Sequence, residues 1–83
     1  MAASREEVYE RVKEVLTEQL GIEEADITEE ASFQEDLDAD SLDLYELVME
    51  LEDRYGVVVS EEQATHIQTV GDAVGFVLEH APA

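Results

Sequence analysis

The sequence predicts an all-α fold, a four-helix bundle made of three longer helices and one short helix. Three long segments carry apolar residues at helical intervals, and capping or turn residues delimit each of them. With 83 residues, the chain fits a single domain, residues 1–83, with one small core. We expect a bundle with a long ordered loop between the first and second helices.

The first predicted helix begins at Ser4, which has capping-box spacing to Glu7, and it ends at Gly21. Its buried face is a set of apolar residues at helical spacing: Val8, Val12, Val15, Leu16 and Leu20. Residues 22–39 have no sustained period, and their apolar anchors are Ile22, Ile27, Phe33 and Leu37. We interpret them as an ordered loop; a loop this long in a compact domain is often functional.

The remaining helices follow closely on one another. The second spans about Ser41 to Tyr55 and stops at Gly56. Val57–Val59 is strand-like but has no second strand to pair with, so we expect an extended connector. Ser60 and Gln63 begin a short helix near residues 61–65, and Thr69 and Asp72 begin the last helix. Its buried stripe is Val70, Ala73, Val74, Val77 and Leu78, and Pro82 closes the chain.

The second helix carries two apolar faces. At about 100° per residue, one face comprises Leu44, Leu47, Val48, Leu51 and Tyr55, which we assign to the core. Nearly opposite lie Leu42, Tyr45 and Met49, beside the carboxylates of Asp43, Glu46, Glu50 and Asp53. A helix of a monomeric domain needs only one apolar face. The second face either packs under the long loop or is offered to a partner, and its acidic rim favours a partner with a cationic groove.

The net charge of the chain limits the classes of partner that it can bind. It has 23 acidic and 4 basic residues, a net charge of -19, and residues 14–53 hold 16 acids and no base. Four cations cannot neutralise a nucleic-acid backbone, so we expect no nucleic-acid partner. Anionic membranes should repel the chain, and partners with basic patches should attract it. Apolar runs of at most three residues predict no membrane insertion, and we expect a cytoplasmic monomer.

The residues do not assemble an enzyme's active site, so we expect a protein that is not an enzyme. The absence of cysteine excludes a thiol nucleophile and thiolate zinc sites. His66 and His80 accompany no nucleophile motif, and no glycine-rich phosphate loop is present. Asp36, Asp38 and Asp40 imitate the start of a calcium loop, but Ser41 and Leu47 stand where that loop needs Gly and Glu. We expect no specific metal site, although loose divalent binding to these carboxylates remains open.

The remaining candidate functional residue is Ser41, at the start of the second helix. A phosphodiester there would lie at the positive end of the helix dipole, near free backbone N–H groups. Alternatively, Ser41 or Asp40 is simply the N-cap of the helix. A cap explains one polar residue, but it does not explain the whole string of residues 37–44 followed by a two-faced acidic helix.

The run Asp40-Ser41-Leu42-Asp43, followed by Glu46-Leu47-Val48-Met49 and Leu51-Glu52, resembles the acyl carrier protein motif. Length, acidity and helix layout extend the resemblance over essentially the full chain. In that family the serine bears a phosphopantetheine arm, which a phosphopantetheinyl transferase donates from coenzyme A, and acyl groups are held on its thiol as thioesters. The resemblance places the arm on Ser41. It also implies a partner-recognition surface: Asp40, Leu42, Asp43, Glu46, Met49, Glu52 and Asp53.

The resemblance implies a carrier that delivers acyl intermediates to the enzymes of a bacterial-type fatty acid synthase through their basic patches. It also implies an apolar cavity for the acyl chain, lined by core residues such as Leu51 and Val70. The alternatives are a carrier for polyketide or other secondary metabolism and, in another class, a small acidic calcium-binding regulatory protein. The chain departs from the family pattern at Asp38, where many carriers have Gly, and at Ser60, where many have Pro. Tyr45 replaces the small aliphatic residue that is common at its position, which bears on access to the pocket or on partner preference.

Overall fold

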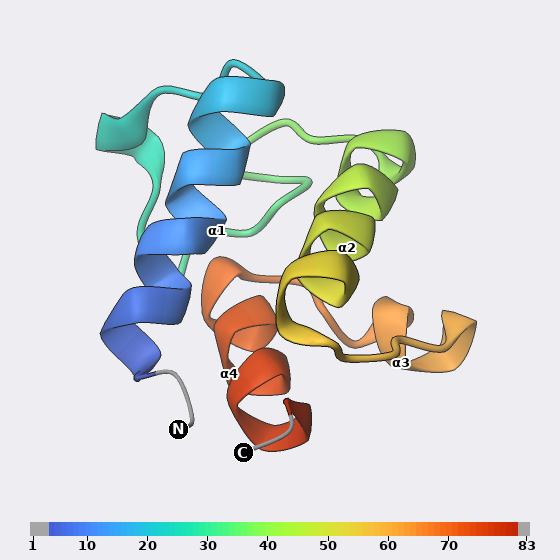
Figure 1. Cartoon of the computed structure of the whole chain (residues 1–83). Coiled ribbons are helices and arrows are strands. Elements are labelled where there is room, and N and C mark those ends of the chain that lie inside the picture. Colours follow the sequence, from blue (N-terminus) through green and yellow to red (C-terminus); the bar gives the residue numbers. More distant parts are fainter. Residues whose placement is uncertain (1–3, 82–83) are drawn as a thin grey trace.

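The computed structural model describes residues 4–81. Over these residues the chain forms four α-helices and no β-strand, which confirms the all-α prediction. The helices are α1 (Arg5–Gln19), α2 (Ser41–Tyr55), α3 (Glu61–Thr65) and α4 (Val70–His80). In Figure 1, α1 runs opposite to α2 and α4, and it packs against both. Pro82, expected to close the chain, lies outside the described residues.

Side-chain caps define where the helices begin. A complete capping box opens three of them: Asp40 with Asp43 (α2), Ser60 with Gln63 (α3) and Thr69 with Asp72 (α4). At α1 the hydroxyl of Ser4 accepts a hydrogen bond from the backbone N–H of Glu7. These bonds satisfy N–H groups that have no partner inside the helix. Gly56 ends α2 in the left-handed conformation, at φ 69°.

The long loop between α1 and α2 is tied to the connection before α4. The backbone N–H of Phe33 donates to the carbonyl of Gln68 (2.9 Å), and that of Val70 donates to the carbonyl of Ala31 (3.1 Å). The loop also contains a 3-10 turn, η1 (Glu24–Asp26), which the sequence pattern did not indicate. The expected anchors Ile27, Phe33 and Leu37 are buried, and Ile22 is partly buried. These bonds and anchors make the loop an ordered part of the core.

The core lies between α1, α2, α4 and the loop. Its helical members include Val8, Val12, Val15, Leu16, Leu47, Leu51, Val70, Ala73, Val74 and Val77. The predicted core residues that are only partly buried are Leu20, Leu44, Tyr55 and Leu78, each packed against the edge of the core. Within residues 4–81 no helix is long and apolar enough to cross a membrane.

Candidate attachment site at the start of helix α2

Ser41 differs from the other serines of the chain in its hydrogen bonding. The other three hydroxyl oxygens each accept a backbone N–H: Ser4 from Glu7 (3.2 Å), Ser32 from Glu35 (3.3 Å) and Ser60 from Gln63 (3.1 Å). Ser41 is exposed as the first residue of α2, and its hydroxyl has no hydrogen-bond partner among residues 4–81. A group can therefore be attached to this oxygen without breaking a bond that the fold uses.

The N-cap of α2 is Asp40, which decides between the two cap candidates. Its Oδ1 accepts the N–H of Asp43 at 2.9 Å, and Oδ2 of Asp43 accepts the N–H of Asp40 at 3.3 Å. The next N–H groups, those of Ser41 and Leu42, have no acceptor in the part of the chain that the structure describes. These free donors and the positive end of the helix dipole suit a phosphate on Ser41.

The outer apolar face of α2 is open to solvent. Leu42, Tyr45 and Met49 are 64%, 61% and 51% exposed, whereas Leu47, Val48 and Leu51 on the other side are buried. The alternative that this face packs under the long loop is therefore wrong. Glu46 and Asp53 are exposed on the same helix, so the face presents apolar side chains with carboxylates beside them.

Two carboxylates assigned to partner recognition also form bonds within the fold. Asp43 is partly covered and belongs to the capping box of α2. Glu52 is partly covered as well, and its Oε2 accepts the backbone N–H of Val59 at 2.8 Å. Glu52 therefore holds the connector of residues 57–59 against α2, a role that sequence spacing alone does not reveal.

The same connector adds an exposed residue that the sequence reasoning missed. Val58 is 80% exposed, while Val57 before it is buried. Both residues line a pocket of about 810 Å³ together with the side chains of α2 that face it: Glu46, Met49, Glu50, Glu52 and Asp53. The alternation of an extended segment would place neighbouring valines on opposite sides, so the pattern was available in the sequence.

Asp38, one of the departures from the family pattern, has a left-handed backbone with φ 55°. Glycine enters this region without steric cost, whereas most other residues avoid it and aspartate is tolerated. The glycine that many carriers have here therefore matches the backbone that this chain adopts two residues before Asp40.

A pocket of about 600 Å³ opens between the long loop, the start of α2 and the segment after α3. Its lining includes Phe33, Leu44, Ala64 and Ile67. Leu51 and Val70, named as candidate lining residues for an acyl cavity, are packed in the core and do not line this pocket.

Two of the aspartates that imitate a calcium loop accept hydrogen bonds from backbone N–H groups. Oδ2 of Asp36 accepts the N–H of Ser32 at 2.7 Å, and Asp40 caps α2. Among residues 4–81, no group of three or more acidic or histidine side chains is arranged to hold a metal ion. The structure thus gives the calcium-binding alternative no additional support.

Known proteins resemble this chain both in sequence and in structure. The family model described as "Phosphopantetheine attachment site" matches residues 10–77. Fold and match together define a helical carrier that bears a phosphopantetheine group. An acyl carrier protein from Rubrobacter xylanophilus is 49% identical over 79 residues, which cover 95% of this chain and 98% of that protein. A solved acyl carrier protein from Enterococcus faecalis has a TM-score of 0.80 and 37% identity, covering 95% of this chain and 100% of that one. The chain belongs to the acyl carrier protein family.

Proposed function

We propose that the chain carries acyl intermediates of fatty acid synthesis, on a phosphopantetheine group attached to Oγ of Ser41. The observation that supports this position is the exposed hydroxyl at the first residue of α2, which has no hydrogen-bond partner within residues 4–81 and lies beside two backbone N–H groups without an acceptor in the same range. In the attachment reaction, the hydroxyl oxygen displaces the nucleotide half of coenzyme A from phosphorus, and the hydroxyl proton leaves to a base of the transferase. When bound, the group supplies the thiol that holds the acyl chain.

The residues of the chain have binding and orienting roles in this proposal. The N–H groups of Ser41 and Leu42 face the negative charge of the phosphodiester, which the dipole of α2 also favours. Leu42 and Met49 supply the apolar centre of the recognition surface, and Glu46 and Asp53 supply charges at its edge. Catalysis belongs to the partner enzymes, which on this proposal dock through basic patches.

Fatty acid synthesis is favoured over polyketide or other secondary metabolism by the resemblance to the bacterial fatty-acid-synthase type. The proposed setting is the cytoplasm, with the carrier acting as a monomer and a single domain. Reconstitution with purified fatty-acid-synthesis enzymes tests the pathway: the loaded carrier should support chain elongation. Elongation only with enzymes of another acyl pathway would replace fatty acid synthesis by that pathway.

Loading is tested by intact-mass measurement after incubation with coenzyme A and a phosphopantetheinyl transferase. We expect a gain of one phosphopantetheine, and digestion should locate it on the peptide that contains Ser41. Ser60 provides the internal control, because it also lies at the start of a helix but its hydroxyl accepts an N–H. A gain on the Ser60 peptide, or no gain at all, would exclude attachment at Ser41.

The recognition surface is tested by the association rate with a fatty-acid-synthesis enzyme. Exchanging Glu46 for Lys should slow association and weaken its salt dependence, because an exposed charge at the edge of an interface acts mainly by steering. Glu18 on α1 is a matched exposed control, and Glu18→Lys should change the rate less. Equal slowing by both variants would mean that net charge, rather than this face, guides the partner.

A further inference from the structure

Tyr45 lies one helical turn after Ser41 on the outer apolar face of α2, and the proposed attachment gives its hydroxyl no role. The residue is 61% exposed, and its hydroxyl has no hydrogen-bond partner within residues 4–81. The other two tyrosines are held by the fold: the hydroxyl of Tyr9 donates to the carbonyl of Ile27 at 3.2 Å, and Tyr55 packs against the core. Tyr45 is thus an aromatic donor that the fold itself does not use.

Helix geometry directs Tyr45 toward Ser41. Residues four apart are neighbours on the helix surface, and helical side chains lean toward the N-terminus of the helix. Tyr45 therefore lies on the same side of α2 as Ser41, one turn further along the helix. One turn rises about 5.4 Å, a span that a tyrosine side chain can bridge. A phosphate on Ser41 would lie within reach of the phenolic hydroxyl.

The charges near Ser41 in the sequence are negative, so a phosphate attached there would benefit from a hydrogen-bond donor. A phosphodiester there would stand among the carboxylates of Asp38, Asp40 and Asp43, which repel it. Each of the four cations already pairs with a carboxylate elsewhere: Arg5 with Glu29, Arg11 with Glu14, Lys13 with Glu10 and Glu24, and Arg54 with Glu50.

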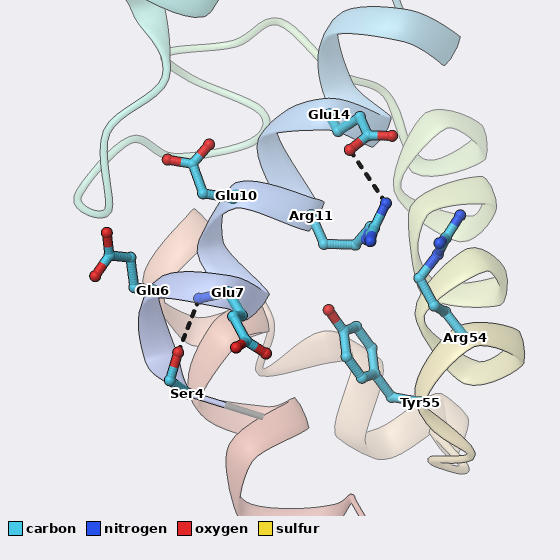
Figure 2. A pocket seen from close by; sticks show the side chains of 8 residues that line it. All are labelled: Ser4, Glu6, Glu7, Glu10, Arg11, Glu14, Arg54 and Tyr55. Carbon is cyan, nitrogen blue, oxygen red and sulfur yellow. Dashed lines mark hydrogen bonds and ion pairs between the residues drawn. The ribbon is translucent and has the colours of Figure 1, made fainter. Parts of the chain in front are cut away.

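The nearest cation along α2 is also too far away. Arg54 stands 13 residues beyond Ser41, on the order of 20 Å along the helix axis. Figure 2 shows it beside Arg11, in the gap between α1 and α2. Along α2, the phosphate has the free backbone N–H groups of Ser41 and Leu42 and, one turn further on, the neutral side-chain donor Tyr45.

We propose that Tyr45 is a positioning residue for the arm. Its hydroxyl donates a hydrogen bond to a phosphate oxygen of the group on Ser41, and its ring limits the directions in which the arm leaves the helix. The proposal rests on the proposed attachment at Ser41. A restricted arm has less conformational freedom to lose when a partner enzyme binds it.

The test is an NMR comparison of the full chain before and after loading. We expect the ring resonances of Tyr45 to shift several-fold more than those of Tyr9 and Tyr55, with nuclear Overhauser contacts from the Tyr45 ring to the arm. Tyr45→Phe keeps the ring and removes the donor, so the phosphorus resonance of the loaded protein should move. Tyr45→Val should, in addition, increase the mobility of the first methylene groups of the arm.

The outcomes separate this proposal from the one on which it rests. If mass measurement shows no loading of Ser41, the proposed attachment fails. If Ser41 is loaded but the ring of Tyr45 shifts no more than the two control rings, and both variants leave the phosphorus resonance and the arm mobility unchanged, the positioning role is overturned. A change of partner affinity in Tyr45→Phe without any of these signals would likewise reject it, and would assign the hydroxyl to the partner.

Discussion

Ser41 and Asp40 are neighbours with different roles: Asp40 caps helix α2, and Ser41 is the proposed attachment residue. Ser41→Ala should abolish loading with phosphopantetheine and change the free energy of unfolding by less than about 0.5 kcal/mol, since no bond of the fold is lost. Asp40→Ala removes the N-cap of α2 and should destabilise the protein by about 0.5–2 kcal/mol while leaving the hydroxyl of Ser41 in place. Urea unfolding and intact-mass measurement check both variants. Loading of Ser41→Ala would refute the assignment, and a cost equal to that of Asp40→Ala would show that Ser41 shares the cap.

For single residues, the sequence identified the candidate functional side chains but not which of them would cap the helix and which would be free. Asp and Ser are both good N-caps, so the order Asp40-Ser41 left two cap candidates, which only backbone geometry separates. Glu52 shows the same limit. The family resemblance placed it with the partner-facing acids, but the chain reverses after Gly56 and brings the N–H of Val59 to its carboxylate.

For α2, the sequence period was enough to predict both faces, and the contrast between them is testable. Leu51 is 3% exposed and Met49 is 51% exposed on the same helix. Leu51→Ala empties a core site and should cost about 2–5 kcal/mol of folding free energy. Met49→Ala should cost little stability and mainly speed dissociation from a partner enzyme, because apolar contacts at an interface centre slow dissociation. Equal destabilisation of the two variants in urea would make Met49 a core residue.

Lys13 joins α1 to the long loop through ion pairs, and these pairs lead us to expect a specific dependence of stability on pH. Nζ of Lys13 lies 3.5 Å from a carboxylate oxygen of Glu10, 3.5 Å from one of Glu24, and 5.1 Å from the ring centroid of Tyr9. Partial burial acts to lower the pKa of Lys13, but the two carboxylates outweigh it and raise the pKa above its ordinary value of 10.5. The pairing thus favours the protonated form, so its stabilisation is complete below the ordinary pKa and is lost as pH rises past the raised one.

Lys13→Gln should therefore be less stable than the parent protein at pH 7–9, and the difference should shrink at pH 11. Urea unfolding at both pH values measures it. A difference that persists unchanged at pH 11 would mean that the aliphatic stem of Lys13, rather than its charge, stabilises this joint.

The long loop is the element that the sequence described least well. Its apolar anchors Ile27, Phe33 and Leu37 were visible, and all three are buried. The turn η1 and the bridge between Ser32 and Thr69 were not visible. A single 3-10 turn is too short to leave a period, and the bridge pairs residues 37 positions apart that share no local pattern. Tertiary pairing, rather than local propensity, orders this segment.

Over the whole molecule, charge opposes folding more than it assists it. The ion pairs among the described residues use all four cations, while the chain holds 23 acids. The exposed ion pairs each contribute at most about 1 kcal/mol. The excess carboxylates, many of them within residues 14–53, repel one another in the compact state. Screening should thus remove more repulsion than attraction.

Raising the salt concentration from low values to about 0.15 M shortens the screening length to roughly 8 Å, so the melting temperature should rise. Relief of about 1 kcal/mol corresponds to a rise of about 4–8 °C for a domain of this size.

Divalent cations should act at lower concentration, because each neutralises two charges and can lie between neighbouring carboxylates. Thermal melts followed by circular dichroism in sodium chloride and in magnesium chloride of matched ionic strength measure both effects. Sulfate at matched ionic strength separates screening from anion effects on burial. A melting temperature that stays constant from low to physiological salt would mean that the folded and unfolded chains carry equal repulsion, and that the acidic surface has no cost in stability.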